Sequence, residues 1–201
     1  MKTKTALLLI DIQKGLNEPF WGKRNNPQAE KNINTLLKLF RATGMAVLHI
    51  QHLSTSSESP LRPGQPGVEF MEFTQPIHGE YIFQKNVNSA FIGTQLEKIL
   101  KKNKIKTLVC VGISTDHCVS TTVRMAGNLG FKAFVIADAT IAFERTGFDG
   151  THYSAESVHA VTLASLHKEF ATVMNTSELI NLIPEFNKLK ECENLEFQPN
   201  I

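Results

Sequence analysis

Three residues whose side chains can perform hydrolytic chemistry, Asp11, Lys85 and Cys118, each lie shortly after an apolar run of the sequence. A carboxylate can accept a proton from a thiol, an ammonium stabilises a thiolate, and a thiolate is a strong nucleophile. Together they predict covalent catalysis by Cys118, with Asp11 as the general base and Lys85 as a stabilising charge. The prediction depends on a fold that brings these three distant residues to one place.

Cys118 has the most informative surroundings, because a helical pattern with Val119 and Val123 on its apolar face begins at this point. Unpaired N–H groups at a helix start stabilise negative charge, so they and Lys85 are expected to lower the pKa of the Cys118 thiol. The same N–H groups can bind the oxyanion of a tetrahedral intermediate. Each residue alone also has an ordinary explanation, as a buried cysteine, an aspartate that ends a strand, or a lysine in solvent. Their combination favours the catalytic interpretation.

The fold that would position these residues is indicated by six short runs of aliphatic and β-branched residues. Most are apolar at successive positions, which is typical of strands buried on both faces of a parallel sheet. Helical patterns separate them, so the sequence predicts an α/β fold of three layers, with a mainly parallel six-stranded sheet between helices. Ligands bind beyond the carboxyl ends of such strands, and Gln51 and His52 also follow one of the runs. The runs are 6–10, 46–50, 81–83, 107–111, 133–137 and 171–174.

Five helices are expected between and after these runs. Asn26 and Pro27 are expected to be the N-cap and first residue of a helix that ends at Gly44. Thr94 and Glu97 have capping-box spacing ahead of the second helix. The third helix is expected to end near Gly130, the fourth to run from Ser154 to about His167, and the fifth to begin near Thr176.

Two segments do not fit the alternation of strands and helices: 16–24 after the first run, and the Ser-, Pro- and Gly-rich 53–78 after the second. Loops of this length inside a compact domain are often binding segments or lids, and the alternative is a surface insertion. Residues 185–201 are polar and mixed. We therefore expect one domain over residues 1–184, followed by an arm or tail.

The composition excludes several classes of function. The 201 residues fit one domain, and 21 Lys and Arg against 19 Asp and Glu give a net charge of +2, too small for a nucleic-acid partner. No apolar stretch approaches the ~20 residues that span a bilayer, and Asp11 interrupts the first apolar run too early for a signal peptide. Three cysteines without paired spacing favour a reducing compartment. A cytoplasmic protein that acts on a small molecule is expected.

The reactive residues stand in three motifs, which are Asp11-x-Gln13, Lys85 followed by Ser89-Ala90-Phe91, and Gly112-Ile113-Ser114-Thr115-Asp116-His117-Cys118-Val119. Over about residues 4–180 the sequence resembles the isochorismatase-like cysteine hydrolase family, which includes nicotinamidases and N-carbamoylsarcosine amidohydrolase. The resemblance implies that Cys118 is the nucleophile, Asp11 its base and Lys85 its charge partner. It also implies a cis peptide before Ser114, and an oxyanion hole formed by the N–H groups of Ser114 and Cys118. Strand order 3-2-1-4-5-6 and a homodimer or homotetramer are implied as well.

One departure from the family concerns metal. Nicotinamidases, which this sequence resembles at 114–119, place an Asp-x-His pair and two further histidines around and after the second strand to hold a divalent ion. In this sequence the histidines in and just after that strand are His49 and His52, and residues 53–77 include neither Asp nor His. Residues three apart on a strand point to opposite faces. No metal and no other cofactor are expected, which makes nicotinamide a poor candidate substrate.

The first long loop supplies Leu16, Phe20 and Trp21 as candidate walls of a substrate pocket, and His117 lies beside the nucleophile. The alternative for Phe20 and Trp21 is that they pack the loop onto the body or onto another subunit. The presence of Cys118 favours acyl transfer, so we predict a metal-independent cysteine hydrolase that cleaves an amide, ureido or lactam C–N bond through a thioester. The alternatives are an isochorismatase-type ether hydrolase and a non-catalytic family member that acts as a binding protein.

Overall fold

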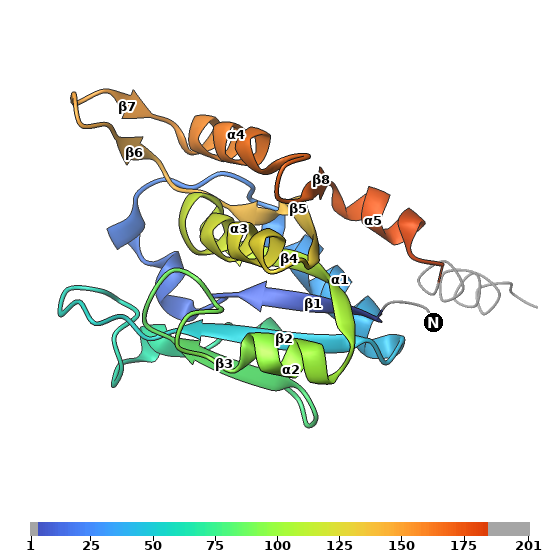
Figure 1. Ribbon diagram of the computed structural model, residues 1–201. Helices are drawn as coiled ribbons and strands as arrows, with labels where there is room; N and C mark the ends of the chain where they lie inside the picture. The colour runs from blue at the N-terminus through green and yellow to red at the C-terminus, as the bar shows by residue number, and fades with distance from the viewer. Residues whose placement is uncertain (1–3, 185–201) are drawn as a thin grey trace, which may run out of the picture.

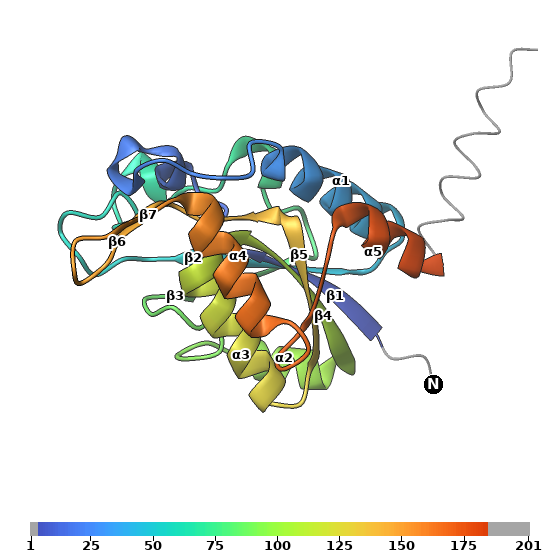
Figure 2. The same ribbon diagram turned by 90° about the horizontal axis from the view of Figure 1, so that it is seen from above.

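The computed structural model describes residues 4–184, which form one parallel sheet with helices on both faces (Figures 1 and 2). The strand order is β3-β2-β1-β4-β5-β8, and every neighbouring pair is parallel. The predicted fold class and strand order are confirmed, with β8 as the sixth strand. The strands are β1 (Lys4–Ile10), β2 (Ala46–His52), β3 (Tyr81–Lys85), β4 (Ile105–Ile113), β5 (Lys132–Ile141) and β8 (Thr172–Met174).

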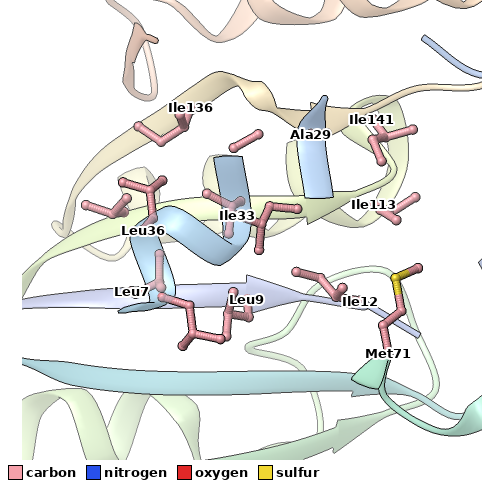
Figure 3. Close-up of a cluster of buried hydrophobic side chains, with 14 of the residues drawn as sticks. Leu7, Leu9, Ile12, Ala29, Ile33, Leu36, Met71, Ile113, Ile136 and Ile141 are labelled. Atoms are coloured by element: carbon pink, nitrogen blue, oxygen red, sulfur yellow. The ribbon is translucent and has the colours of Figure 1, made fainter. Parts of the chain in front are cut away.

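Two helical layers bury the two faces of the sheet, as the view from above shows (Figure 2). Successive residues of β1 alternate between two core clusters: Leu7 and Leu9 belong to one, and Leu8 and Ile10 to the other. Figure 3 shows the first cluster, in which Leu7 and Leu9 face Ile33 on a helix. Continuous burial of β1 explains why its run is apolar at every position. The first cluster includes residues of α1 (Ala29–Ala42) and α5 (Thr176–Leu182), and the second includes residues of α2 (Leu96–Lys102), α3 (Ser120–Asn128) and α4 (Ala155–Leu166).

The start of α1 corrects the predicted role of Asn26. The helix begins at Ala29, and Asn26 does not cap it. The side-chain amide of Asn26 instead donates hydrogen bonds to the carbonyls of Ala137 and Thr140, at 2.8 and 2.7 Å. These carbonyls lie on β5 where its pairing with β4 is irregular, between Val135 and Ile141. The prediction was wrong because tertiary acceptors on another strand bind this amide.

The N-terminal ends of the other helices agree in part with those predicted from the sequence. Ser154 caps α4 as predicted, by accepting a hydrogen bond from the N–H of Ser157. The predicted capping box at Thr94 is absent from α2, and the Thr94 hydroxyl accepts a hydrogen bond from the N–H of Leu96 instead. In α5 the N-cap is Asn175, one residue before Thr176, and it forms a capping box with Glu178. The helix positions were therefore predicted better than the caps.

The two long segments fold onto each other beyond the carboxyl end of β1. The first carries the 3-10 turns η1 (Lys14–Asn17) and η2 (Pro19–Trp21), and the second carries η3 (Pro66–Val68) and η4 (Glu72–Thr74). The backbone N–H of Lys14 donates to Glu69 and that of Met71 donates to Ile12, at 2.9 and 3.1 Å. The segment 53–78 is thus an ordered covering of the sheet end rather than a separate insertion.

A short hairpin of β6 (Arg145–Thr146) and β7 (His152–Tyr153) was not predicted, and it projects from the body near α4 (Figure 1). Its strands have only two residues each, which is too short for a periodic pattern. Among residues 4–184, no helix is both long and apolar enough to cross a membrane. The predicted arm or tail, 185–201, lies outside the described residues.

Candidate active site

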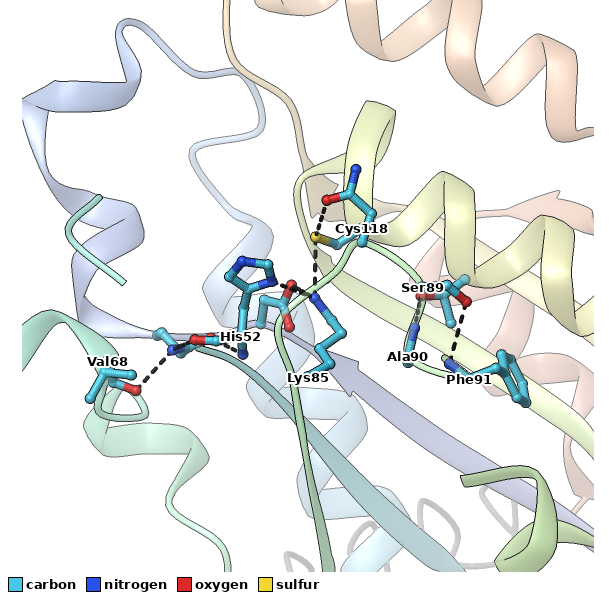
Figure 4. A network of polar contacts seen from close by, with 11 residues as sticks. His52, Val68, Lys85, Ser89, Ala90, Phe91 and Cys118 are labelled. Carbon is cyan, nitrogen blue, oxygen red and sulfur yellow. Dashed lines mark hydrogen bonds and ion pairs between the residues drawn. The ribbon is translucent and has the colours of Figure 1, made fainter. Parts of the chain in front are cut away.

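Asp11, Lys85 and Cys118 meet at the carboxyl end of the sheet, as the sequence predicts. The Lys85 Nζ atom lies 2.6 Å from Asp11 Oδ2 and 3.3 Å from Cys118 Sγ (Figure 4). The side chains of Lys85 and Asp11 are 0% and 2% exposed, so this ion pair is buried. The pair is therefore screened little by solvent, and its charges act strongly on the sulfur.

The backbone at the ends of β1 and β4 makes this meeting possible. Asp11 directly follows β1 with a φ of 52°, and its N–H donates to the Ile50 carbonyl at the end of β2. Gly112 pairs with Ile10 across the β1–β4 ladder. A Cβ atom on Gly112 would lie 2.0 Å from the Ile10 carbonyl oxygen, so only glycine lets the two strand ends approach this closely.

Cys118 follows β4 through a specialised turn. The Ile113–Ser114 peptide is cis, as the family resemblance implies. Residues Thr115–Val119 form a π-helical turn that leads directly into α3, and Cys118 lies within it. The carbonyl of Ser114 accepts hydrogen bonds from the N–H groups of His117 and Val119, which closes the turn around Cys118. The predicted place of Cys118 at a helix start is therefore close to the observed one.

The surroundings of Cys118 shift the pKa of its thiol in the direction opposite to the prediction. Burial raises the pKa of the Cys118 thiol, and the nearby Asp11 carboxylate raises it further, while Lys85 lowers it. The expectation of a lowered pKa was wrong because desolvation and Asp11 outweigh Lys85 and the helix start. A Cys118 thiol therefore has to lose its proton when it reacts with substrate.

Asp11 is placed to accept that proton. An oxygen of its carboxylate lies within 4.8 Å of Cys118 Sγ. Its Oδ2 atom is held by Lys85, whereas its buried Oδ1 atom has no hydrogen-bond partner among the described residues. A buried acceptor without a donor is rare in proteins, and a catalytic role is one explanation for it. The free Oδ1 atom is thus suited to the role of general base.

His52, at the end of β2, completes the group, although it was not among the predicted site residues. Its Nδ1 atom lies 2.9 Å from Lys85 Nζ (Figure 4). One ligand atom each of Asp11, His52 and Cys118 lie within 4.8 Å of one another, which is a plausible set of metal ligands. However, the Lys85 ammonium contacts all three residues and already supplies a positive charge between them. The group does not fit a metal ion while Lys85 remains charged in place.

His49 lies apart from this group, so the predicted divergence of the two histidines is confirmed. Its buried Nε2 atom pairs with Glu80 Oε2 at 2.8 Å. Burial lowers the pKa of His49, although Glu80 raises it in part. His49 therefore belongs to a buried polar pair away from Cys118.

Gln13 explains the spacing of the Asp11-x-Gln13 motif. Its fully buried carboxamide binds the backbone of His52 twice, by accepting from its N–H at 2.8 Å and donating to its carbonyl at 3.0 Å. It also donates to the Val68 carbonyl at 2.9 Å (Figure 4). The segment that follows β1 and carries Asp11 thus also fixes the end of β2 and the turn η3.

The predicted substrate walls divide into packed and exposed residues. Leu16 is buried in the first core cluster. Trp21 donates from Nε1 to the Gly15 carbonyl at 2.7 Å and lies 6.0 Å from Phe143, centroid to centroid. Trp21 therefore packs its loop onto the body of the protein, which was the alternative to a role as a substrate wall. Phe20 packs edge-on against Trp21 but is 58% exposed, so it is the most exposed of the three predicted wall residues.

Two exposed polar side chains lie near Cys118. His117 is adjacent in sequence, and its Nε2 atom lies 3.4 Å from Asp116 Oδ2. Asp116 Oδ2 also lies 2.9 Å from Arg145 Nε. This ion pair engages an arginine that could otherwise bind a substrate carboxylate. Asn88, which was not predicted, accepts a hydrogen bond from Cys118 Sγ at 3.8 Å. The contact of His117 with substrate remains a prediction.

Comparisons with known proteins find relatives that match most of the chain. The Isochorismatase domain model matches residues 5–178. The isochorismatase family protein YrdC of Bacillus subtilis is 47% identical over 181 residues, which cover 90% of this chain and 97% of that protein. Nicotinamidase 3 of Arabidopsis thaliana is 27% identical, and the match covers 87% of this chain and 86% of that protein. A crystal structure of an isochorismatase-family hydrolase from Chromobacterium violaceum has a TM-score of 0.87 and 42% identity, and the match covers 93% of this chain and 95% of that one.

Proposed function

The chain belongs to the isochorismatase family of hydrolases, and on this basis we propose that it cleaves a C–N bond of a small amide, ureido compound or lactam through a thioester on Cys118. The observation that carries the proposal is the Lys85 ammonium, which joins a buried carboxylate to the Cys118 sulfur. A thiol next to a base and a fixed cation is the arrangement that covalent acyl transfer requires. The similarity to Nicotinamidase 3 supports an amide-type substrate.

The proposed reaction begins when Asp11 Oδ1 takes the Cys118 proton and the sulfur attacks the substrate carbonyl carbon. The N–H groups of Ser114 and Cys118 bind the resulting oxyanion. Collapse of the tetrahedral intermediate breaks the C–N bond, and the leaving nitrogen takes the proton from Asp11. Asp11 then removes a proton from water, which attacks the thioester and releases the acid. The sulfur leaves as a thiolate and recovers its proton from Asp11, while Lys85 keeps its charge throughout.

The two alternatives account for fewer of these contacts. Cleavage of a vinyl ether, as in isochorismatase, needs an acid and has no use for a thiol. A binding protein without catalysis has no use for a buried carboxylate whose Lys85 partner also contacts a sulfur. The cysteine hydrolase uses Asp11, Lys85 and Cys118 together.

A panel of primary amides, carbamoyl compounds and lactams, assayed for ammonia release or ring opening, tests the proposal. A vinyl ether substrate is included in the panel as a separate class. We expect turnover of at least one C–N substrate by the native protein. Turnover of the vinyl ether alone, retained when Cys118 is replaced by alanine, would establish the ether hydrolase instead.

We expect activity on any substrate found to survive treatment with EDTA followed by dialysis. The reason is that Lys85 supplies the positive charge beside Asp11, His52 and Cys118, so a metal ion is not needed there. Initial rates before and after chelation are the measurement. A loss of activity that zinc or iron restores would contradict both this prediction and metal-independent catalysis.

We also expect the protein to form a homodimer or homotetramer. Large apolar side chains are exposed on two successive segments: Phe148, in the loop between β6 and β7, is fully exposed, and Val161 on α4 is 71% exposed. Contact between copies at these side chains would remove their apolar surface from water. Light scattering at micromolar concentration should give a multiple of the 22.4 kDa chain mass. A mass near that of one chain would contradict the prediction. The cytoplasmic location remains a prediction as well.

A further inference from the structure

We propose that His52 is a positioning residue that holds the Lys85 ammonium against Cys118, by accepting a hydrogen bond at Nδ1 while its own proton lies on Nε2. The inference rests on the proposed function only in taking Cys118 as the reactive group. Its structural basis is the contact of 2.9 Å between Lys85 Nζ and His52 Nδ1.

The first argument counts donors and acceptors. A lysine ammonium has three N–H donors and no acceptor. Lys85 Nζ has three contacts, at 2.6 Å to Asp11 Oδ2, 2.9 Å to His52 Nδ1 and 3.3 Å to Cys118 Sγ. The Lys85 side chain is fully buried, so water does not replace a lost acceptor easily. His52 Nδ1 must therefore accept, which requires the neutral imidazole.

The surroundings of His52 favour the same protonation state. Burial lowers the pKa of His52 and the Lys85 charge lowers it further, while Asp11 raises it. A protonated His52 would have no acceptor and would place a second cation next to the ammonium. The charged groups that face this ring are Asp11 and Lys85, and only Asp11 favours the protonated form.

The second argument concerns the rigidity of His52. Gln13 binds both its N–H and its carbonyl, so the backbone that carries the ring is fixed relative to β1. Of the three contacts of Lys85, the one to sulfur is the longest, and the ion pair with Asp11 is the shortest. Without the Nδ1 acceptor, one N–H of Lys85 is left unpaired in a buried site. The ammonium then moves away from Cys118 to find a partner, and thiolate stabilisation weakens.

The test compares two amide variants that differ in which ring nitrogen they replace. In His52→Asn the carbonyl oxygen lies close to the place of Nδ1, whereas in His52→Gln the carboxamide lies close to the place of Nε2. The measurement is the rate at which iodoacetamide alkylates Cys118, from about pH 7 to about pH 10, with the adduct located by peptide mass mapping. This measurement of the alkylation rate needs no substrate. We expect the rate in His52→Asn to stay within about threefold of the native rate and that in His52→Gln to fall about tenfold or more, since tenfold corresponds to about one pKa unit.

The outcomes separate positioning from a purely structural role. Thermal unfolding of both variants is measured alongside, and His52→Leu replaces His52→Gln if the latter does not fold. Equal alkylation rates in the Asn and Gln (or Leu) variants would overturn the proposal, because rescue then does not depend on an acceptor at the Nδ1 position. If the rates differ as expected but no C–N substrate is found, the positioning role stands and the proposed function fails.

Discussion

Replacement of Cys118 by alanine is expected to lower kcat by about four orders of magnitude or more on any C–N substrate found in the panel. The reason is that the mechanism forms a covalent bond at Sγ, and no neighbouring side chain can replace that atom. The measurement is the initial rate at saturating substrate. Mass spectrometry of an acid-quenched reaction of the native protein should also show the acyl group on the peptide that contains Cys118.

The matched control is Cys110→Ala. Cys110 is fully buried in the second core cluster, where burial raises the pKa of its thiol to about 12. Its replacement should leave turnover intact and affect stability only. Near-normal turnover in Cys118→Ala, or an acyl group on Cys110 or on Cys192, which lies outside the described residues, would refute the mechanism.

Replacement of Gly112 by alanine is expected to destabilise the protein by roughly 3–5 kcal/mol and to lower kcat as well. The added Cβ would lie 2.0 Å from the carbonyl oxygen of Ile10 and 2.8 Å from its carbon, and Gly112 has a φ of 132°. The ends of β1 and β4 must therefore separate, and Asp11, the next residue after Ile10, moves away from Cys118. Urea unfolding gives the free energy of unfolding, and initial rates give kcat.

Gly44→Ala provides the control for this second prediction. Gly44 also has a positive φ, of 64°, but a Cβ atom there would meet no atom within 4 Å. Its replacement should destabilise by only about 1–2 kcal/mol, through the backbone conformation alone. If the two variants lost the same stability, the close approach of β1 and β4 would not be the reason for glycine at position 112.

The parts of the fold that could be predicted are those determined by burial pattern. A run such as 6–10, apolar at every position, has few structures available other than a strand covered on both faces, and β1 has that structure. The meeting of Asp11, Lys85 and Cys118 followed from the rule that parallel strands present their carboxyl ends on one edge. The strand order came from the family resemblance.

The parts that could not be predicted depend on contacts between distant segments. Asn26 has the chemistry of an N-cap, but β5 offers it two carbonyls. The pKa of Cys118 depends on the depth of burial, which a sequence pattern does not report. The role of His52 could have been suspected from its place at the end of the second strand, but the contact with Lys85 requires the register of β2 and β3, in which these two residues are paired.

The Gln13 carboxamide has a consequence for motion. It donates to the carbonyls of both His52 and Val68, and Gln51 donates to the same Val68 carbonyl. Because these bonds share partners, the turn at Val68 and the last residue of β2 cannot loosen independently. We therefore expect them to open as one cooperative unit, with amide hydrogens that exchange with solvent at a common rate. A ligand that moves the Val68 turn on entry therefore changes the fluctuations of His52, and through them those of the Lys85 ammonium, before it reaches the sulfur.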